Sequence, residues 1–221
     1  MQMEHYTQTE RTTLRRLPKR AHYDRDTVHA ILDAGTICHV GYVVNDQPYV
    51  TPTMYWRHED RVYWHGSSAS RMLRVLTLGT PVCLTVTHLD GLVLARSAFN
   101  HSANYRSVIA FGTAQALQHP AEKMAALKHL TERLFPGRWT EIRQPSDQEL
   151  KATTVLWLDL EEVSAKVRSG PPVDDEEDYA RPVWAGVLPI AAVVEIPHPD
   201  PSLAPGIALP PYLADWKLSG V

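Results

Sequence analysis

Residues 48–76, PYVTPTMYWRHEDRVYWHGSSASRMLRVL, decide the fold, because they predict two β-strands followed at once by a helix. Tyr49–Trp56 is rich in β-branched and aromatic residues, and Arg61–His65 repeats that composition after the turn Arg57–Asp60. Pro52 has no amide hydrogen to donate, so the first strand cannot form an uninterrupted central ladder. A strand-turn-strand unit with an interruption at Pro52 is therefore the expected centre of the fold.

The segment after these strands changes to a helical period. Within Ser67–Leu78, one helical face collects Met72, Leu73 and Leu76. The lead-in His65–Arg71 joins strand to helix through a glycine and three serines. Free amides at a helix start favour anions, and the Arg71 guanidinium would add a contact for phosphate oxygens. Serines before a helix more often serve as caps, so both interpretations stay open at this point.

Strand patterns continue on both sides of this centre. Upstream, a helix is expected over Asp24–Ala34, with Gly35 at its C-terminal cap, followed by a strand over Thr36–Val44. The expected downstream elements are a hairpin of Val82–His88 and Leu92–Arg96 around Leu89–Gly91, a long strand over Tyr105–Leu117 with a bulge at Gly112, a helix over Pro120–Phe135, a short helix capped by Ser146, and strands over Thr153–Leu160 and Val163–Arg168. Many strands with few helices predict a mainly β fold (α+β) in the form of an antiparallel barrel.

Composition excludes several classes of protein. Of the 221 residues, 44% are hydrophobic and 21% are charged, which suits a chain that buries a core. Uncharged apolar runs such as Ile190–Val194 are far too short to span a bilayer, and residues 1–20 lack the apolar stretch of a secretory signal. Two cysteines, Cys38 and Cys83, are expected to be reduced and structural. We expect a cytoplasmic protein, and the net charge of −3 argues against nucleic-acid binding.

Charge and proline divide the chain into three parts. From Gly170 onward there are eight acidic residues against Arg181 and Lys217, together with ten of the 17 prolines. We expect a basic N-terminal segment over 1–20, a barrel domain over 21–170 and an acidic, proline-rich arm over 171–221 that docks on the barrel. The run Asp174–Asp178 is expected to stay in solvent, which leaves Val183–Ile190 as the docking piece.

Common catalytic and metal motifs are missing from the sequence. The eleven histidines include no His-Glu-x-x-His pattern, and there is no Cys-x-x-Cys, so no metal site is predicted. There is no Gly-x-Ser-x-Gly elbow for a nucleophile, and no Gly-x-Gly-x-x-Gly or Gly-x-x-x-x-Gly-Lys loop for a nucleotide. Any phosphate must therefore be held by other means.

Four segments in order resemble the FMN-binding split barrels of the pyridoxamine 5′-phosphate oxidase-like superfamily. The segments are PYVTPTMYW (Pro48–Trp56), VYWHGSSASRMLRVL (Val62–Leu76), NYRSVIAFGTAQAL (Asn104–Leu117) and WAGVLPI (Trp184–Ile190). Within the superfamily the chain is most similar to the nitroimidazole-resistance reductases and related flavin-nucleotide-binding proteins. The resemblance implies an antiparallel split β-barrel with an extended C-terminal arm, acting as a homodimer that binds FMN at the subunit interface.

The resemblance also implies a set of site residues. Pro52, Thr53, Met54 and Tyr55 would line the flavin ring and ribityl chain, Trp64 and His65 would lie beside the ring, and Ser67, Ser70 and Arg71 would contact the phosphate. Met72 belongs to the set but replaces a lysine that family members often have. Arg106 and Ser107 match a segment that reaches the flavin from the second subunit, and Trp184 matches a tryptophan that borders the cofactor or anchors the arm.

The implied function is FMN-dependent oxidoreduction of a small organic molecule, with electrons from NADH or NADPH. His65 is the candidate catalytic proton donor, because histidine titrates near neutrality; a plain hydrogen-bonding role is the alternative. No arginine follows Trp184, and this departure from true pyridoxamine-phosphate oxidases argues against pyridoxal phosphate synthesis. The alternatives are a non-catalytic flavin-binding or sensor protein, or a haem- or deazaflavin-binding relative on the same fold.

Overall fold

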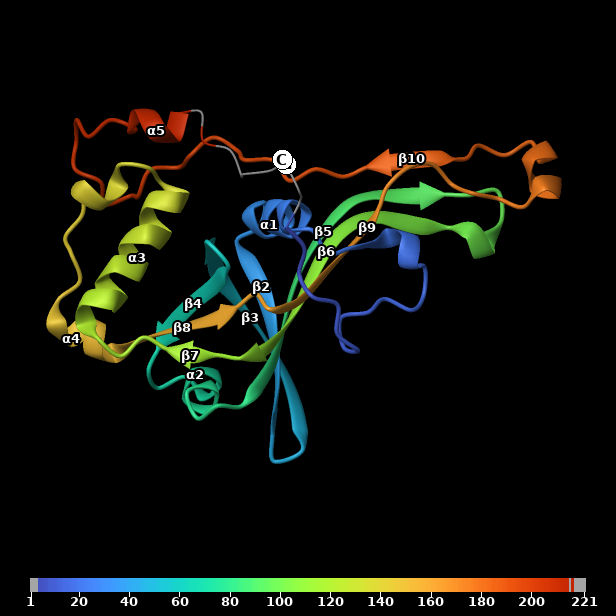
Figure 1. Ribbon diagram of the computed structural model, residues 1–221. Coiled ribbons are helices and arrows are strands. Elements are labelled where there is room, and N and C mark those ends of the chain that lie inside the picture. The colour runs from blue at the N-terminus through green and yellow to red at the C-terminus, as the bar shows by residue number, and fades with distance from the viewer. Residues whose placement is uncertain (1–3, 215, 217–221) are drawn as a thin grey trace.

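The computed structural model describes residues 4–214 and 216. The helices are α1 (Arg25–Asp33), α2 (Arg71–Leu76), α3 (Pro120–Leu134), α4 (Asp147–Ala152) and α5 (Pro211–Ala214). The strands are β1 (Ala21–His22), β2 (Ile37–Val44), β3 (Gln47–His58), β4 (Arg61–Ser67), β5 (Pro81–Leu94), β6 (Ser102–Thr113), β7 (Gln115–Ala116), β8 (Thr153–Asp159), β9 (Glu162–Arg168) and β10 (Gly186–Pro189). Figure 1 shows a curled sheet with α3 and α4 on one side and a long projection of β5, β6 and β10 on the other.

The strands form one antiparallel sheet in the order β1-β9-β6-β5-β2-β3-β4-β8-β7, and β10 pairs with β5 beside this path. Ala114 alone separates β6 from β7, and β7 pairs with β8 at the far end of the order. The sheet therefore curls back toward its own middle strands, and the expected antiparallel split barrel is confirmed. No helix among the described residues is long and apolar enough to cross a membrane.

Local chemistry explains the first elements. The Asp24 carboxylate caps α1 by accepting a hydrogen bond from the Thr27 amide at 2.8 Å. The buried face of α1 consists of Val28, Ile31 and Leu32, as its helical spacing predicts. Between β2 and β3, Asn45 and Asp46 have φ angles of 50° and 63°, the left-handed values that a two-residue hairpin turn requires.

The sheet separates between β3 and β4. These strands pair at only four positions, from Tyr55 opposite Trp64 to His58 opposite Arg61. Before Tyr55, β3 pairs with β2 alone, and after Trp64, β4 pairs with β8 alone. Pro52 lies in the part of β3 that has one neighbour, so its missing amide hydrogen interrupts no ladder there. We call this opening between β3 and β4 the split.

Two apolar clusters support the sheet. The larger fills the barrel interior and includes Tyr55 and Trp64, which are 1% and 0% exposed. The smaller lies under α3, where Trp56, Leu130 and Val155 are buried together. Tyr55 and Trp56 therefore face opposite sides of β3, as alternation along a strand requires.

Two local expectations are wrong. Leu89–Gly91 is not a hairpin, because β5 runs unbroken through it with Asp90 as one extra residue opposite β6. Gly112 pairs regularly with Val82 rather than forming a bulge; a Cβ there would meet Leu158 at 2.7 Å, so the glycine is needed for close packing. The position expected for Gly35 is confirmed, because it directly follows Ala34, the C-cap of α1; a Cβ at Gly35 would meet the Tyr55 hydroxyl oxygen at 2.8 Å.

The acidic run was expected in solvent, and this is wrong for two of its members. Asp174 is buried and accepts hydrogen bonds from the Arg96 amide at 2.9 Å and the Ser97 amide at 3.4 Å. Its carboxylate also pairs with the Arg96 guanidinium at 3.2 Å. Asp178 is buried as well and pairs with Arg181 at 2.5 Å. Each buried carboxylate has local partners, which lowers the cost of its burial. Burying all five acidic side chains without partners would cost far more.

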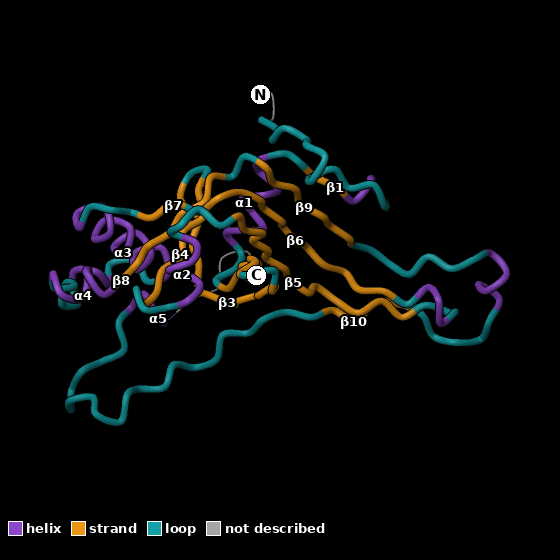
Figure 2. Tube along the Cα trace, turned by 90° about the horizontal axis from the view of Figure 1, so that it is seen from below, coloured by secondary structure: helices purple, strands orange, loops and turns teal. Residues whose placement is uncertain are grey.

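The arm beyond Arg168 first runs out along the projection and returns as β10, which pairs with the outer half of β5. Figure 2 shows it continuing as a long loop apart from the sheet before it reaches α5. Its final residues, Lys217 among them, lie outside the described residues.

Candidate functional site

The split has two strand edges without a strand partner on the facing side. Residues 47–54 of β3 form one edge and residues 65–67 of β4 form the other. Backbone amides and carbonyls along such edges are free to bind a ligand. The predicted residues Thr53, Met54 and Tyr55 lie at one side of this opening, and the segment from Trp64 to Arg71 lies at the other.

Side chains on the β3 edge alternate between the two faces. Pro52 and Met54 are exposed on the outer face of the sheet, and Thr53 is half-buried on the inner face. Tyr55 is buried, and its hydroxyl donates to the Leu32 carbonyl at 2.5 Å. Burial raises the pKa of Tyr55 well above its ordinary value, so this phenol stays a neutral hydrogen-bond donor.

Trp64 and His65 point to opposite faces of β4. Trp64 lies wholly in the barrel core, and His65 packs edge-on against Trp56 with ring centroids 6.0 Å apart. The buried atoms Nε1 of Trp64 and Nδ1 of His65 have no hydrogen-bond partner among the described residues. Burial lowers the pKa of His65 below its ordinary 6.5, so the imidazole is neutral at pH 7.

The lead-in to α2 differs from the sequence prediction. The helix begins at Arg71, not Ser67, and the preceding residues form a turn in which the Ser70 amide donates to the Ser67 carbonyl at 2.9 Å. The Ser67 hydroxyl accepts from the Ala69 amide at 3.2 Å. Met72 is buried, so its side chain belongs to the core rather than to the opening.

Two arginines project beside this turn. Arg71 lies over the Tyr49 ring, with its guanidinium carbon 5.2 Å from the centroid. Arg71 and Arg74 line the same open pocket of about 560 Å³ with Ala69 and Thr77, and neither forms an ion pair within the described residues. Sequence reasoning missed Arg74. Its spacing of three from Arg71 is the signal, because residues i and i+3 share a helix face.

Arg106 and Ser107 lie elsewhere in the single chain. Both are on β6, which β5 and β2 separate from β3. Arg106 binds the Asp90 carboxylate with Nη2 at 2.8 Å, and this hydrogen bond raises the pKa of Arg106 above its ordinary value. The Ser107 hydroxyl donates to the Lys166 carbonyl at 3.3 Å. One copy of the chain therefore does not bring these two residues to the split.

Trp184 is also remote from the split. It stands just before β10, is 70% exposed and lies against Gly186, where a Cβ would come within 2.8 Å of the indole. Its roles as a flavin neighbour or as an anchor both stay predictions.

The outer face of the sheet beside the split is exposed and apolar. Cross-strand register places Ile37 opposite Met54, and His39 opposite both Pro52 and Thr85, so these residues share one face of β2, β3 and β5. Thr85 pairs in turn with Ile109 of β6. The large apolar side chains exposed there are Ile37, Val43, Val50, Met54 and Ile109. We call this surface the outer face.

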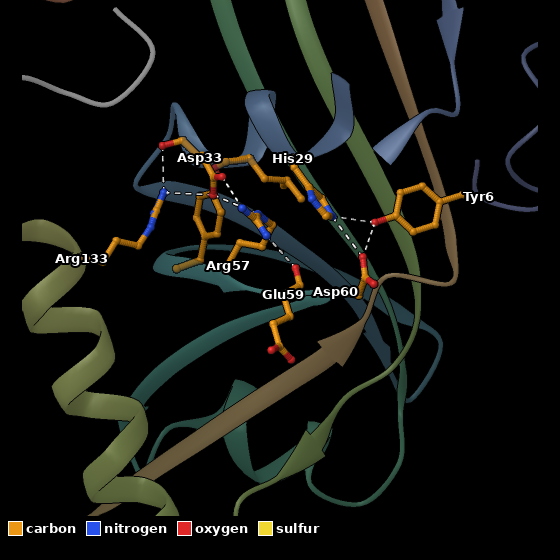
Figure 3. A network of polar contacts seen from close by, with 9 residues as sticks. Tyr6, His29, Asp33, Arg57, Glu59, Asp60 and Arg133 are labelled. Atoms are coloured by element: carbon orange, nitrogen blue, oxygen red, sulfur yellow. Dashed lines mark hydrogen bonds and ion pairs between the residues drawn. The ribbon is translucent and has the colours of Figure 1, made fainter. Parts of the chain in front are cut away.

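A polar network lies around the β3–β4 turn (Figure 3). The Asp60 carboxylate accepts from the Tyr6 hydroxyl at 2.9 Å and lies 3.1 Å from His29 Nε2. Burial and the Asp60 carboxylate raise the pKa of Tyr6 far above its ordinary value. This network ties the N-terminal segment to α1 and to the turn.

The same network continues toward α3. Arg57 Nε donates to Asp33 Oδ1 at 3.0 Å, and Arg133 Nη2 donates to the Asp33 carbonyl at 2.8 Å. With His58 and His129 these residues line a pocket of about 420 Å³. No group of three or more metal-ligating side chains occurs in the part of the chain that the structure describes.

Two solved structures match this chain along nearly its whole length. It is 47% identical to the flavocytochrome Anf3 of Azotobacter vinelandii over 95% of this chain and 98% of that one, with a TM-score of 0.91. It is 36% identical to an FAD- and haem-binding protein of Mycobacterium smegmatis over 89% of this chain and 97% of that one, with a TM-score of 0.86.

A more distant structure matches a smaller part of the chain. An FAD-binding protein of Mesorhizobium loti is 16% identical over 68% of this chain and 98% of its own, with a TM-score of 0.50, which shows a shared fold. No curated protein matches the sequence.

The family comparison agrees with the sequence resemblance. The family model described as pyridoxamine 5′-phosphate oxidase matches residues 24–167, which include the barrel, the split and α2. That match extends over more than half of the chain. The chain therefore belongs to the pyridoxamine 5′-phosphate oxidase family.

Proposed function

We propose that this protein is a flavin- and haem-binding redox protein that works as a homodimer. The observation that carries the proposal is its likeness, along almost the whole chain, to a flavocytochrome and to an FAD- and haem-binding protein. The sequence alone favoured FMN with haem as an alternative. We now propose both kinds of group, with FAD as the flavin.

The split suits a flavin. Its two strand edges offer free backbone groups, and His65 brings a buried ring nitrogen that has no partner within the described residues. A buried polar group without a partner costs about 1–3 kcal/mol, which a ligand that bonds to it would recover. We propose that Pro52 to Tyr55 flank the ring and that neutral His65 holds a hydrogen bond to it.

The phosphate end favours FAD over FMN. Arg71 and Arg74 line one pocket, and a dinucleotide carries two linked phosphates where FMN carries one. Two planar guanidinium groups on one helix face match two anionic groups better than one. FMN, the sequence-based expectation, stays the competing ligand and uses Arg71 with the turn of Ser67 and Ser70.

The outer face supports a homodimer. Isolated exposed apolar residues are common, but a contiguous group on one sheet face marks an interaction surface. Ser107 lies on the same face of β6 as Ile109, so we propose that a second copy packed there brings its β6 toward the split, as the family resemblance implies for Arg106 and Ser107. We therefore propose that each flavin contacts two subunits.

A flavin held at the split would supply hydride acceptance from a nicotinamide and transfer of single electrons, which a haem could receive. We propose NADH or NADPH as the electron source. The protein contributes orientation, a neutral imidazole and exclusion of water at the interface. The arm has no arginine after Arg181, so the substrate phosphate clamp expected of pyridoxal phosphate synthesis is missing from the sequence.

The test is a spectrum of the purified protein, with masses of the groups it releases on denaturation. Flavin and haem bands together, with an FAD mass, support the proposal; an FMN mass corrects the flavin, and no flavin overturns it. Anaerobic addition of NADH or NADPH should bleach the flavin and then shift the haem bands. Protein that binds both groups but stays oxidised would be a carrier or sensor rather than an NAD(P)H oxidoreductase.

A further inference from the structure

Three aromatic side chains lie in a row across β3, β4 and β8. Trp56 of β3 is directly opposite Tyr63 of β4, and Tyr63 is directly opposite Trp157 of β8. Residues that are directly opposite each other project from the same face of a sheet, and here it is the face that α3 covers. Figure 1 shows these strands next to one another beside α3. We call these three residues the aromatic row.

The first two members of the aromatic row are stacked. The rings of Trp56 and Tyr63 have centroids 5.5 Å apart and an interplanar angle of 14°. Stacking of this kind brings two π systems into van der Waals contact. An electron passes between such rings much faster than through solvent or saturated carbon, because their π orbitals overlap.

The inner end of the aromatic row meets the split. Trp56 is 1% exposed and packs against His65, with ring centroids 6.0 Å apart. His65 is the residue that we propose holds the flavin ring. Leu130 and Val155 are buried with the Trp56 indole, so its surroundings are apolar. An electron taken from Trp56 would leave a positive charge that these surroundings disfavour, and a neighbour that can neutralise the charge would receive it.

Tyr63 has the chemistry to neutralise that charge. A phenol that gives up an electron becomes strongly acidic and loses its proton, so the product is a neutral radical. Tyr63 is half-buried, and solvent that reaches part of its side chain can take the proton. Loss of the proton makes the transfer of an electron from Tyr63 to Trp56 hard to reverse.

The outer member of the aromatic row is protected from oxidation. The Arg61 guanidinium carbon lies 3.9 Å from the centre of the Trp157 ring. This cation attracts the π electrons of the indole and repels a positive charge on it. An electron path along the row therefore ends at Tyr63. Trp157 is half-buried on the same sheet face as Tyr63, so it offers a matched control.

The other aromatic residues at the closed end of the split offer no such path. The Tyr55 hydroxyl donates to the Leu32 carbonyl at 2.5 Å, and a carbonyl oxygen cannot keep that proton. Burial raises the pKa of Tyr55 well above its ordinary value. Trp64 is 0% exposed in the barrel core, so a positive charge on it would have no contact with solvent.

We propose that Trp56 and Tyr63 form an electron path that makes the bound flavin photoreducible by a thiol in solution. The light-excited flavin is the oxidant, and it takes one electron from Trp56. Trp56 takes one electron from Tyr63, and the phenolic proton of Tyr63 goes to water. A thiolate then returns one electron to the Tyr63 radical and water returns the proton, while pairs of the resulting thiyl radicals join as a disulfide. This rests on the proposed function, because it requires a flavin at the split.

The experiment uses the full-length protein with its bound groups, illuminated with blue light in the absence of oxygen. Absorbance measures the flavin and haem reduced per light dose with dithiothreitol present, and electron paramagnetic resonance without the thiol detects the radical left on the chain. The variants are Trp56→Phe and Tyr63→Phe, with Trp157→Phe as the control. We expect a tyrosyl radical in the parent and in the control. Both variants should lose this radical and be photoreduced several-fold more slowly.

The outcomes separate this inference from the proposed function. Parent protein that binds no flavin overturns the flavin half of the proposed function and this inference together. Flavin-loaded parent protein that forms no tyrosyl radical overturns the inference alone, and so does either variant if it keeps the radical and the photoreduction rate of the parent. Tyr63→Phe retains the ring that stacks on Trp56, so it decides the question if Trp56→Phe releases the flavin.

Discussion

Tyr55 and Trp64 form the last cross-strand pair between β3 and β4, and beyond it the two strands separate. Both side chains are buried in the barrel core, and the Tyr55 hydroxyl is bonded to the end of α1. The closed end of the split is therefore fixed by core packing. A ligand bound at the open end would meet a preorganised edge and lose less entropy on binding.

The phosphate contacts can be tested by removing one arginine at a time. Arg71→Ala and Arg74→Ala should each weaken FAD binding by about 10- to 150-fold, because each removes a charge-assisted contact. Riboflavin, which has no phosphate, should bind both variants nearly as it binds the parent. Calorimetry or fluorescence titration measures this, with exposed Arg16→Ala as the control. Equal losses for riboflavin and FAD would place the phosphate elsewhere.

His65 should make flavin binding and stability depend on pH. Its pKa in the folded protein is below the ordinary 6.5, because burial disfavours the charged form. As pH falls below about 6.5, the unfolded chain takes up a proton that folded His65 does not, so stability declines until the folded pKa is passed. His65→Gln should remove the part of the stability loss at low pH that is due to His65. A melting curve at pH 7.5 and 5.5 for both proteins measures it, and identical pH dependence in the two would contradict the assignment.

Much of the centre of the fold could be predicted from sequence because its signals are local. The order of β3, β4 and α2 follows from residue types within one stretch, and Pro52 correctly marked an open edge. The residues Leu89–Gly91 predicted a hairpin turn that does not form, and the reason lies in contacts distant in sequence. Asp90 bonds Arg106, and Gly91 pairs with Pro189 of β10, so contacts distant in sequence keep β5 straight through a turn-like tripeptide.

Other features depended on contacts that no short pattern encodes. Burial of Asp174 requires Arg96, which lies 78 positions earlier in the sequence. Residues of the outer face become a surface only through register, since its exposed apolar residues come from three strands, β2, β3 and β6. The positions predicted for Arg106 and Ser107 refer to a second subunit, and Trp184 was predicted to border the flavin or to anchor the arm. A single chain does not test these predictions.

The dimer can be tested on the outer face with a residue outside the candidate flavin contacts. Val50→Glu should place a charge in the subunit interface, which for an obligate dimer is of the order of 2,000 Å². We expect a shift in solution mass from twice 24.9 kDa toward 24.9 kDa, with loss of flavin. Val193→Glu, at another exposed valine, this one in the arm, is the matched control. Light scattering after gel filtration measures the mass, and a monomer that retains flavin would contradict the shared site.

Asp174 should hold the first part of the arm to the body. Asp174→Asn keeps the shape but removes the charge that Arg96 faces, so we expect a lower melting temperature and faster proteolysis between residues 170 and 190. Hydrogen bonds to Asp174 lower its pKa below the ordinary 3.8 despite burial. This carboxylate therefore stabilises the fold above about pH 4, and the contribution is lost as pH falls through the lower folded value. Exposed Asp175→Asn is the control. Equal melting temperatures and proteolysis rates in the two variants would contradict a role for Asp174 in holding the arm to the body.

Trp184 tests whether the arm reaches the flavin of another subunit. Within one chain the Trp184 indole is exposed. It precedes β10, which pairs with the outer end of β5, away from the split, so it can border a flavin only across a dimer interface. A nearby indole quenches flavin emission, and Trp184→Ala should then brighten the flavin without changing the solution mass. Deletion from Pro182 onward also removes β10, and should brighten it further and loosen the flavin. Val183→Ala, at the neighbouring exposed residue, controls for the substitution. Unchanged emission and affinity in Trp184→Ala would mean that the indole only packs on Gly186, and Trp184 would leave the set of flavin contacts.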